Sequence, residues 1–125
     1  MKYLLDVNAL LAAIIQNHPN HALVDAWVCN KKLAVCPLSE LGFLRIATHP
    51  NAYNLSMRIA RQGLRNFLVS SQAEFIPADL RALSASAAKS AEVTDSYLAE
   101  LAAHHNLSLA TLDEGVKHGA AELIK

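Results

Sequence analysis

The chain has 125 residues, of which 53% are hydrophobic and 18% charged, a composition typical of one compact globular domain spanning 1–125. Eleven basic residues balance eleven acidic ones, so overall charge gives no support for nucleic-acid binding and any such site must be local. The two cysteines form neither a disulfide framework nor a zinc pattern, which fits a reducing cytoplasm. The first apolar run, 9–15, is too short to span a bilayer, and we expect a soluble cytoplasmic protein without a membrane partner.

Short apolar strands alternate with helices along the whole chain. The predicted elements of the first half are a strand at 2–5, a helix at 8–16, a helix at 21–30, a strand at 33–36 and a helix at 40–47. Those of the second half are a helix at 54–70, a strand at 74–76, a loop or frayed helix at 85–91, a helix at 95–105 that Thr94 caps, a strand at 107–112, a short helix at 114–118 and an edge strand at 121–124. Strands separated by helices of this length indicate βαβ units, an α/β class and a mostly parallel sheet.

Four acidic residues stand where these elements change. Asp6 ends the first strand, Glu40 follows the second and Asp113 follows the fourth, while Asp95 opens a helix. Carboxyl ends of parallel strands meet at one edge of a sheet, where sites of open α/β folds lie. Carboxylates gathered there repel one another by roughly 4 kcal/mol per pair at about 4 Å. A hard divalent cation with oxygen ligands is the simplest relief, so the pattern predicts a metal site.

Each acid also has an ordinary structural interpretation. Asp95 and Asp113, taken singly, fit first-turn or N-cap carboxylates. Glu40 lies on an otherwise apolar helix, where a buried carboxylate needs a partner or a metal. Asp6 ends what the pattern indicates to be the central strand and is followed by a nearly unbroken apolar stretch. The coincidence of all four favours one shared site.

Four segments carry a resemblance to a known family. They are Leu4–Ala12 (LLDVNALLA), Ser39–Arg45 (SELGFLR), Val93–Ala99 (VTDSYLA) and Leu109–Asp113 (LATLD). In this order and spacing they resemble a PIN-domain ribonuclease of the VapC type, the toxin of a bacterial toxin–antitoxin pair. The resemblance implies a three-layer α/β/α sandwich around a central, mostly parallel sheet of four to five strands. It further implies that the four acids form a cluster that binds Mg²⁺ or Mn²⁺, and that a cognate antitoxin blocks the site.

One departure from the family lies beside the last acid. Asp113 is followed by Glu114 and Gly115, where many relatives carry a basic residue. The acidic cluster itself is unaffected, and only substrate contacts near this loop differ.

The chemistry expected of such a cluster is phosphodiester hydrolysis. A cation held by carboxylates lowers the pKa of bound water, orients the phosphate and screens the transition state. Asp6 and Asp95 are the expected direct ligands, and Glu40 and Asp113 are expected to complete the shell through water, to hold a second ion or to act as general base. Three further residues, Asn8, Thr94 and Thr111, are expected either to orient the attacking water or to cap helices and turns.

The RNA substrate needs a local basic surface. Arg58, Arg61 and Arg65 share one face of the long helix at i, i+3 and i+7, which suits backbone phosphates. Arg45 follows Glu40 by five residues and is expected to reach the scissile phosphate or a neighbouring acid. The alternative is a solvated face with incidental salt bridges.

The histidines show no spacing typical of a metal site, and the long helix is unusually apolar. His104 and His105 are adjacent and expected to point in different directions, and no HExxH or CxxC spacing exists, so no transition-metal site is predicted. The long helix carries more apolar residues than a small domain covers, which predicts a homodimer.

Two rival functions stay open. One is a non-catalytic interaction module on the same fold, with its acids retained as caps. The other is a phosphatase of the haloacid dehalogenase type, which requires a second Asp where this chain has Asn8.

Overall fold

A computed structural model describes residues 1–125, and its centre is one sheet of five parallel strands. The strands are β1 (Lys2–Leu5), β2 (Lys32–Val35), β3 (Glu74–Phe75), β4 (Ser108–Thr111) and β5 (Ala121–Leu123), in the spatial order β3-β2-β1-β4-β5. The predicted parallel sheet is confirmed. The first strand is central, as expected, because its residues are apolar on both faces.

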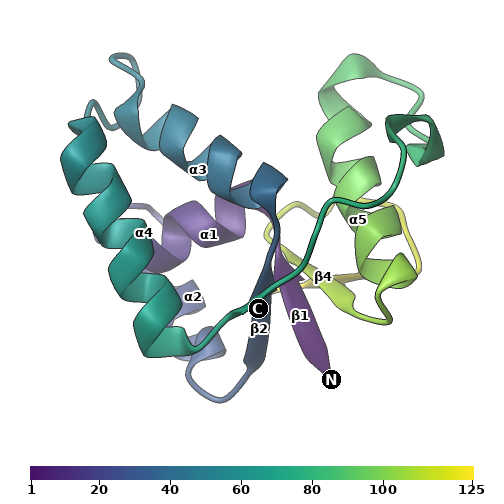
Figure 1. The fold of residues 1–125 in the computed structure, drawn as a ribbon, viewed down its shortest axis with the longest axis horizontal. Coiled ribbons are helices and arrows are strands. Elements are labelled where there is room, and N and C mark those ends of the chain that lie inside the picture. The colour runs from purple at the N-terminus through teal and green to yellow at the C-terminus, as the bar shows by residue number, and fades with distance from the viewer.

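Helices cover both faces of this sheet. On one face lie α1 (Val7–Ile14), α2 (His21–Val28), α3 (Pro37–Thr48) and α4 (Met57–Ser71), and on the other lies α5 (Val93–His104) (Figure 1). Alternate strand residues feed two separate cores: Leu5 and Val35 pack with α1 to α4, whereas Leu4 and Ala34 pack with α5. This is the three-layer α/β/α sandwich that the resemblance implied.

Three helix starts differ from the prediction by two or three residues. The helix α3 begins at Pro37 rather than at 40, with the proline in its first turn. The helix α5 begins at Val93, after the 3-10 turn Ser90–Glu92, so Thr94 lies inside the helix and caps nothing. The helix α4 begins at Met57, later than expected, because the Ser56 hydroxyl accepts a hydrogen bond from the Ile59 N–H.

The segment between β4 and β5 also differs. No helix forms at 114–118, where the structure has turns and irregular backbone. One carboxylate oxygen of Asp113 accepts a hydrogen bond from the Gly115 N–H at 2.8 Å, which forms a local turn. Gly115, with its low helix propensity, disfavours a helix after this turn. The ambiguous 85–91 stretch is irregular as far as Lys89, and its last two residues belong to the 3-10 turn Ser90–Glu92. None of the helices is long and apolar enough to cross a membrane.

Candidate active site

Asp6 is the most deeply buried acid of the chain. It follows β1 directly and is 2% exposed. Its carboxylate caps α1 by accepting a hydrogen bond from the Ala9 N–H at 2.7 Å. Burial is the main reason that the pKa of Asp6 rises to about 6; hydrogen bonds from Thr111 and Ala9 oppose the rise, and the charges of Asp95 and Asp113 add to it. The cap therefore does not compensate the buried charge.

Asp95 and Asp113 come from two other segments of the chain and line one cavity together. Asp95 lies in the first turn of α5 and Asp113 two residues after β4, and both line a cavity of about 340 Å³. Burial raises the pKa of Asp95, and the charge of Asp113 raises it further. Three carboxylates from three distant segments are thus electrostatically coupled.

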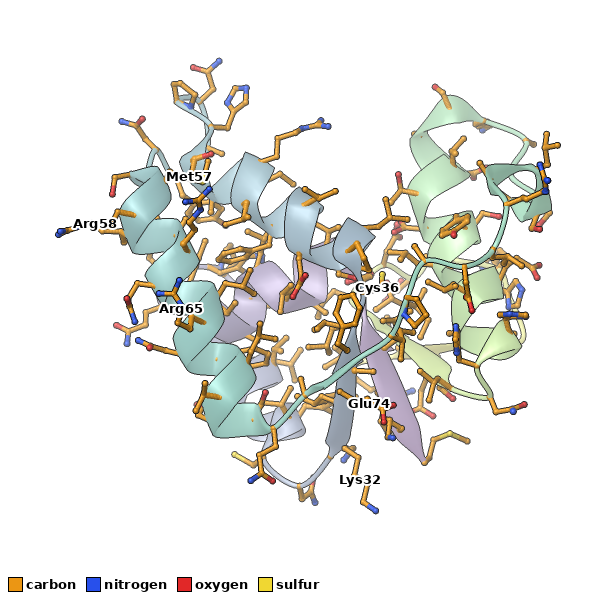
Figure 2. All side chains as sticks on the ribbon, in the orientation of Figure 1. Lys32, Cys36, Met57, Arg58, Arg65 and Glu74 are labelled. Atoms are coloured by element: carbon orange, nitrogen blue, oxygen red, sulfur yellow. The ribbon has the colours of Figure 1, made fainter.

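Glu40 reaches the same edge of the sheet by a different route. It lies in the first turn of α3, which Pro37 opens, and the buried Ser39 hydroxyl donates a hydrogen bond to the Leu5 carbonyl at 2.7 Å. This bond holds the start of α3 beside the end of β1. Cys36, the residue between β2 and α3, is labelled in this region of Figure 2. Burial alone raises the pKa of Glu40. Its first-turn position on α3 places it at the same edge of the sheet as Asp6.

A close helix contact fixes this geometry. A Cβ atom on Gly42 would lie 2.4 Å from a methyl carbon of Val7, so α3 approaches α1 more closely than any larger residue at 42 allows. Val7 follows Asp6 and Gly42 follows Glu40 by two residues. The contact therefore sets the relative positions of the two acids.

No cation of the protein neutralises these carboxylates. The ion pairs of the structure are Lys2–Glu74, His104–Asp79, His105–Asp79 and His118–Glu100, and none includes one of the four acids. A buried carboxylate beside two others, with no basic partner, fits a hard divalent cation with oxygen ligands. Asp6, Asp95 and Asp113 are the coupled carboxylates from which the ligands of such a cation would come.

The three predicted supporting residues have different surroundings. Thr111 is 2% exposed; its hydroxyl accepts a hydrogen bond from the Asp113 N–H at 3.0 Å and lowers the pKa of the neighbouring Asp6 carboxyl. Asn8 is exposed, and its carbonyl oxygen pairs with the Nε2 of His18 at 2.9 Å. Thr94 lines a separate apolar cavity beside Tyr97. Of the three, Thr111 is the residue that contacts an acid.

The predicted basic residues are exposed, and none of them forms an ion pair with an acid. Arg45 is on α3 and forms no ion pair with an acid. Of its two expected contacts, the one with a neighbouring acid is therefore not made, and the one with the scissile phosphate stays a prediction. Arg58, Arg61 and Arg65 are all exposed on α4, and α4 lies on the other side of α3 from α5 (Figure 1). Figure 2 shows Arg58 pointing outward from this helix.

Two arrangements were missed by sequence reasoning. The positioning contacts of Ser39 and Gly42 have a signal in hindsight, since both are small residues on an otherwise apolar helix start. The second is a contact between His104, His105 and Asp79, which corrects the expectation that the two histidines point apart. Asp79 lies far from both in the chain, so no local spacing reveals it.

Comparison with known proteins identifies the fold family. The PIN domain model matches residues 3–122. The chain belongs to the PIN-domain family. This PIN domain is 35% identical to ribonuclease VapC38 of Mycobacterium tuberculosis, an alignment that covers 90% of this chain and 86% of the relative. It is 32% identical to ribonuclease VapC29 of the same species, covering 94% and 90%.

A solved structure supports the same fold. A chain of VapBC2 from Rickettsia felis, crystallised with a DNA fragment from its promoter, superposes with a TM-score of 0.67 over 100% of both chains. Its sequence identity to this PIN domain is 16%, so this likeness concerns the fold alone. The family resemblance drawn from the four segments is confirmed.

Proposed function

We propose that this PIN domain is a metal-dependent endoribonuclease that acts as the toxin of a toxin–antitoxin pair. The observation that carries the proposal is the buried, uncompensated Asp6 carboxylate, coupled to Asp95 and Asp113 at the carboxyl edge of the sheet. The ribonuclease activity named for its VapC relatives gives the substrate class. Membership of the PIN family also removes the haloacid dehalogenase alternative.

The four acids would have distinct roles. Asp6 and Asp95 would hold a divalent cation, Mg²⁺ or Mn²⁺, which supplies a more acidic water and charge stabilisation at the phosphate. Thr111 orients Asp6 by hydrogen bonding, and Asp113 completes the ligand shell directly or through water. Glu40 is the carboxylate that we assign to accept a proton from the attacking water, because burial raises its pKa.

The rival is a non-catalytic interaction module, and Asp6 is the residue that separates the two. Its role as N-cap of α1 is the feature that this rival requires. A cap alone, however, does not explain why three carboxylates converge.

Cleavage of single-stranded RNA by the purified chain tests the proposal. We expect cleavage that requires Mg²⁺ or Mn²⁺ and is abolished by a chelator. Asp6→Asn should lower the rate at least about a hundredfold, because asparagine keeps an oxygen acceptor for the Ala9 N–H while removing the charge that holds the cation. Asp25→Asn, an exposed acid on α2, is the matched control and should retain full activity.

Two results would count against the proposal in different ways. Undiminished metal-dependent cleavage by Asp6→Asn would show that the site assignment is wrong. A wild-type chain that cleaves no RNA with either metal would favour the interaction module.

Protein partners are part of the same proposal. Three large apolar side chains remain exposed on α4, namely Met57 (44%), Ile59 (55%) and Val69 (73%). Leu64 of the same helix is buried, and Leu55, Phe67 and Leu68 are partly buried, so the intramolecular core covers only part of the apolar surface. We propose that a second copy of the chain covers the exposed part as a homodimer, and that an antitoxin protein covers the acidic edge.

A further inference from the structure

The side chains of Asp79, His104 and His105 converge at the end of α5 that is remote from the acidic cavity. One carboxylate oxygen of Asp79 lies 2.8 Å from the Nε2 of His105 and 3.9 Å from the Nε2 of His104. One ligand atom from each residue lies within 4.8 Å of the other two. Asp95 marks the first turn of α5 and His104 its last residue, so the helix separates the two clusters.

We propose that these three side chains form a second metal site, which takes a borderline divalent transition ion such as Zn²⁺ or Ni²⁺. Two imidazole nitrogens and one carboxylate oxygen are a donor set that suits these ions and not Mg²⁺. The acidic cavity, in contrast, offers carboxylates. The chain would thus hold two chemically different cation sites, and this inference does not depend on the proposed ribonuclease activity.

The spacing of the ligand atoms suits a tetrahedral ion after small side-chain movements. Ligands about 2.0–2.1 Å from a tetrahedral ion lie roughly 3.3 Å from each other. The two measured separations from the Asp79 oxygen fall on either side of this value. The side chains of His104 and Asp79 are 49% and 46% exposed, so they have room to adjust and solvent can supply the fourth ligand.

The surroundings also favour a cation. The cluster lies at the carboxyl end of a twelve-residue helix, where the free carbonyl groups and the helix dipole stabilise positive charge. The two imidazole rings meet edge to face, with centroids 5.1 Å apart and planes at 86°, so they do not stack against each other. A hydrogen bond from Tyr97 to the Leu80 carbonyl, at 2.6 Å, holds the segment that carries Asp79 against α5 (Figure 1).

An ion bound here would join the β3–α5 connection to the end of α5. The same connection supplies Ser86, Ala87 and Ala88 to the wall of the acidic cavity. Metal binding at the second site would therefore stabilise the segment that forms part of the first.

Isothermal titration calorimetry of the full chain with Zn²⁺ tests the proposal. Excess Mg²⁺ is present throughout to occupy the acidic site. We expect one Zn²⁺ per chain, and we expect His104→Gln and Asp79→Asn each to weaken binding more than about tenfold. His49→Gln and Cys29→Ser, which remove exposed ligands elsewhere, should leave the affinity unchanged. Replacing Zn²⁺ with Co²⁺ should give the visible absorption of a tetrahedral site with nitrogen ligands.

His104→Gln is the decisive variant because it leaves the Asp79–His105 hydrogen bond in place and should not impair folding. Zn²⁺ should raise the melting temperature of the wild-type chain by more than that of this variant. Equal Zn²⁺ affinity in the wild type and in the double variant His104→Gln, His105→Gln would overturn the proposal. Absence of Zn²⁺ binding by the wild type in the presence of Mg²⁺ would do the same.

Discussion

At the scale of single residues, Asp6 combines two roles that conflict in the absence of metal. Its carboxylate caps α1, which stabilises the fold, but burial and the neighbouring acids raise its pKa to about 6. A carboxyl whose pKa is higher in the folded state than the ordinary 3.8 binds its proton more tightly in that state. Its contribution to stability is therefore largest at low pH and is lost as the pH rises from about 4 through 6.

The free energy of unfolding of the metal-free chain should accordingly depend on Asp6. At pH 7.5, Asp6→Asn should be more stable than the wild type by up to roughly 3 kcal/mol, and at pH 4 this advantage should disappear. Burial lowers the pKa of His18, whose protonation acts in the opposite direction, so the variant must be compared with the wild type at each pH. Urea unfolding in chelator measures the difference, with Asp25→Asn as control. An equal difference at both pH values would show that Asp6 is not the buried, perturbed acid of the structure.

At the scale of elements, the strands and long helices were predictable because hydrophobic periodicity reports which faces are buried. The strand Lys2–Leu5 was predicted with its observed bounds. The acids Glu40 and Asp95 lie inside the first turns of α3 and α5 rather than at the first residues of these helices. The turn at 113–115 was missed because it depends on a local hydrogen bond that the Gly115 N–H donates to the Asp113 carboxylate. The cluster of Asp79 with His104 and His105 was missed because it depends on how the β3–α5 connection crosses α5, which no local pattern encodes.

The α1–α3 contact is the element-level feature on which the acidic edge depends. Gly42→Ala should destabilise the chain by about 1–2 kcal/mol, because overpacking against Val7 outweighs the higher helix propensity of alanine. Adding Val7→Ala should relieve the clash and give a favourable coupling energy in a double-mutant cycle measured by urea unfolding. Gly119→Ala, where the new Cβ meets nothing within 4 Å, is the control. If the two substitutions at 7 and 42 are additive, the helices do not approach as closely as described.

At the scale of the whole molecule, zero formal net charge conceals an uneven distribution. Acids occupy the carboxyl edge of the sheet, whereas Arg58, Arg61 and Arg65 are exposed on α4. An RNA strand that contacts both must pass over α3, which carries the exposed Arg45. The RNA-binding role of the four arginines stays a prediction, and its alternative is a solvated helix face.

The salt dependence of RNA binding separates these two possibilities. In an Asp6→Asn background, which we expect to prevent cleavage, replacing Arg58, Arg61 and Arg65 with Gln should weaken binding. It should also reduce the steepness of the slope of log affinity against log salt concentration by up to about 2. The reason is that each lost phosphate contact on a single strand removes roughly 0.7 from this slope. Fluorescence anisotropy with a labelled single-stranded RNA at several salt concentrations measures both effects.

The matched control removes the same charge from the opposite edge of the sheet. Replacing Lys2, Lys31 and Lys32 with Gln also lowers the net charge by three, but two of these residues begin β1 and β2 at their amino ends. The one ion pair lost, Lys2–Glu74, is exposed and contributes little to stability. A general effect of net charge would change the slope equally in both triple variants. A flatter slope in the arginine variant alone would place the RNA backbone along α4, and equal slopes would show that this helix face is merely solvated.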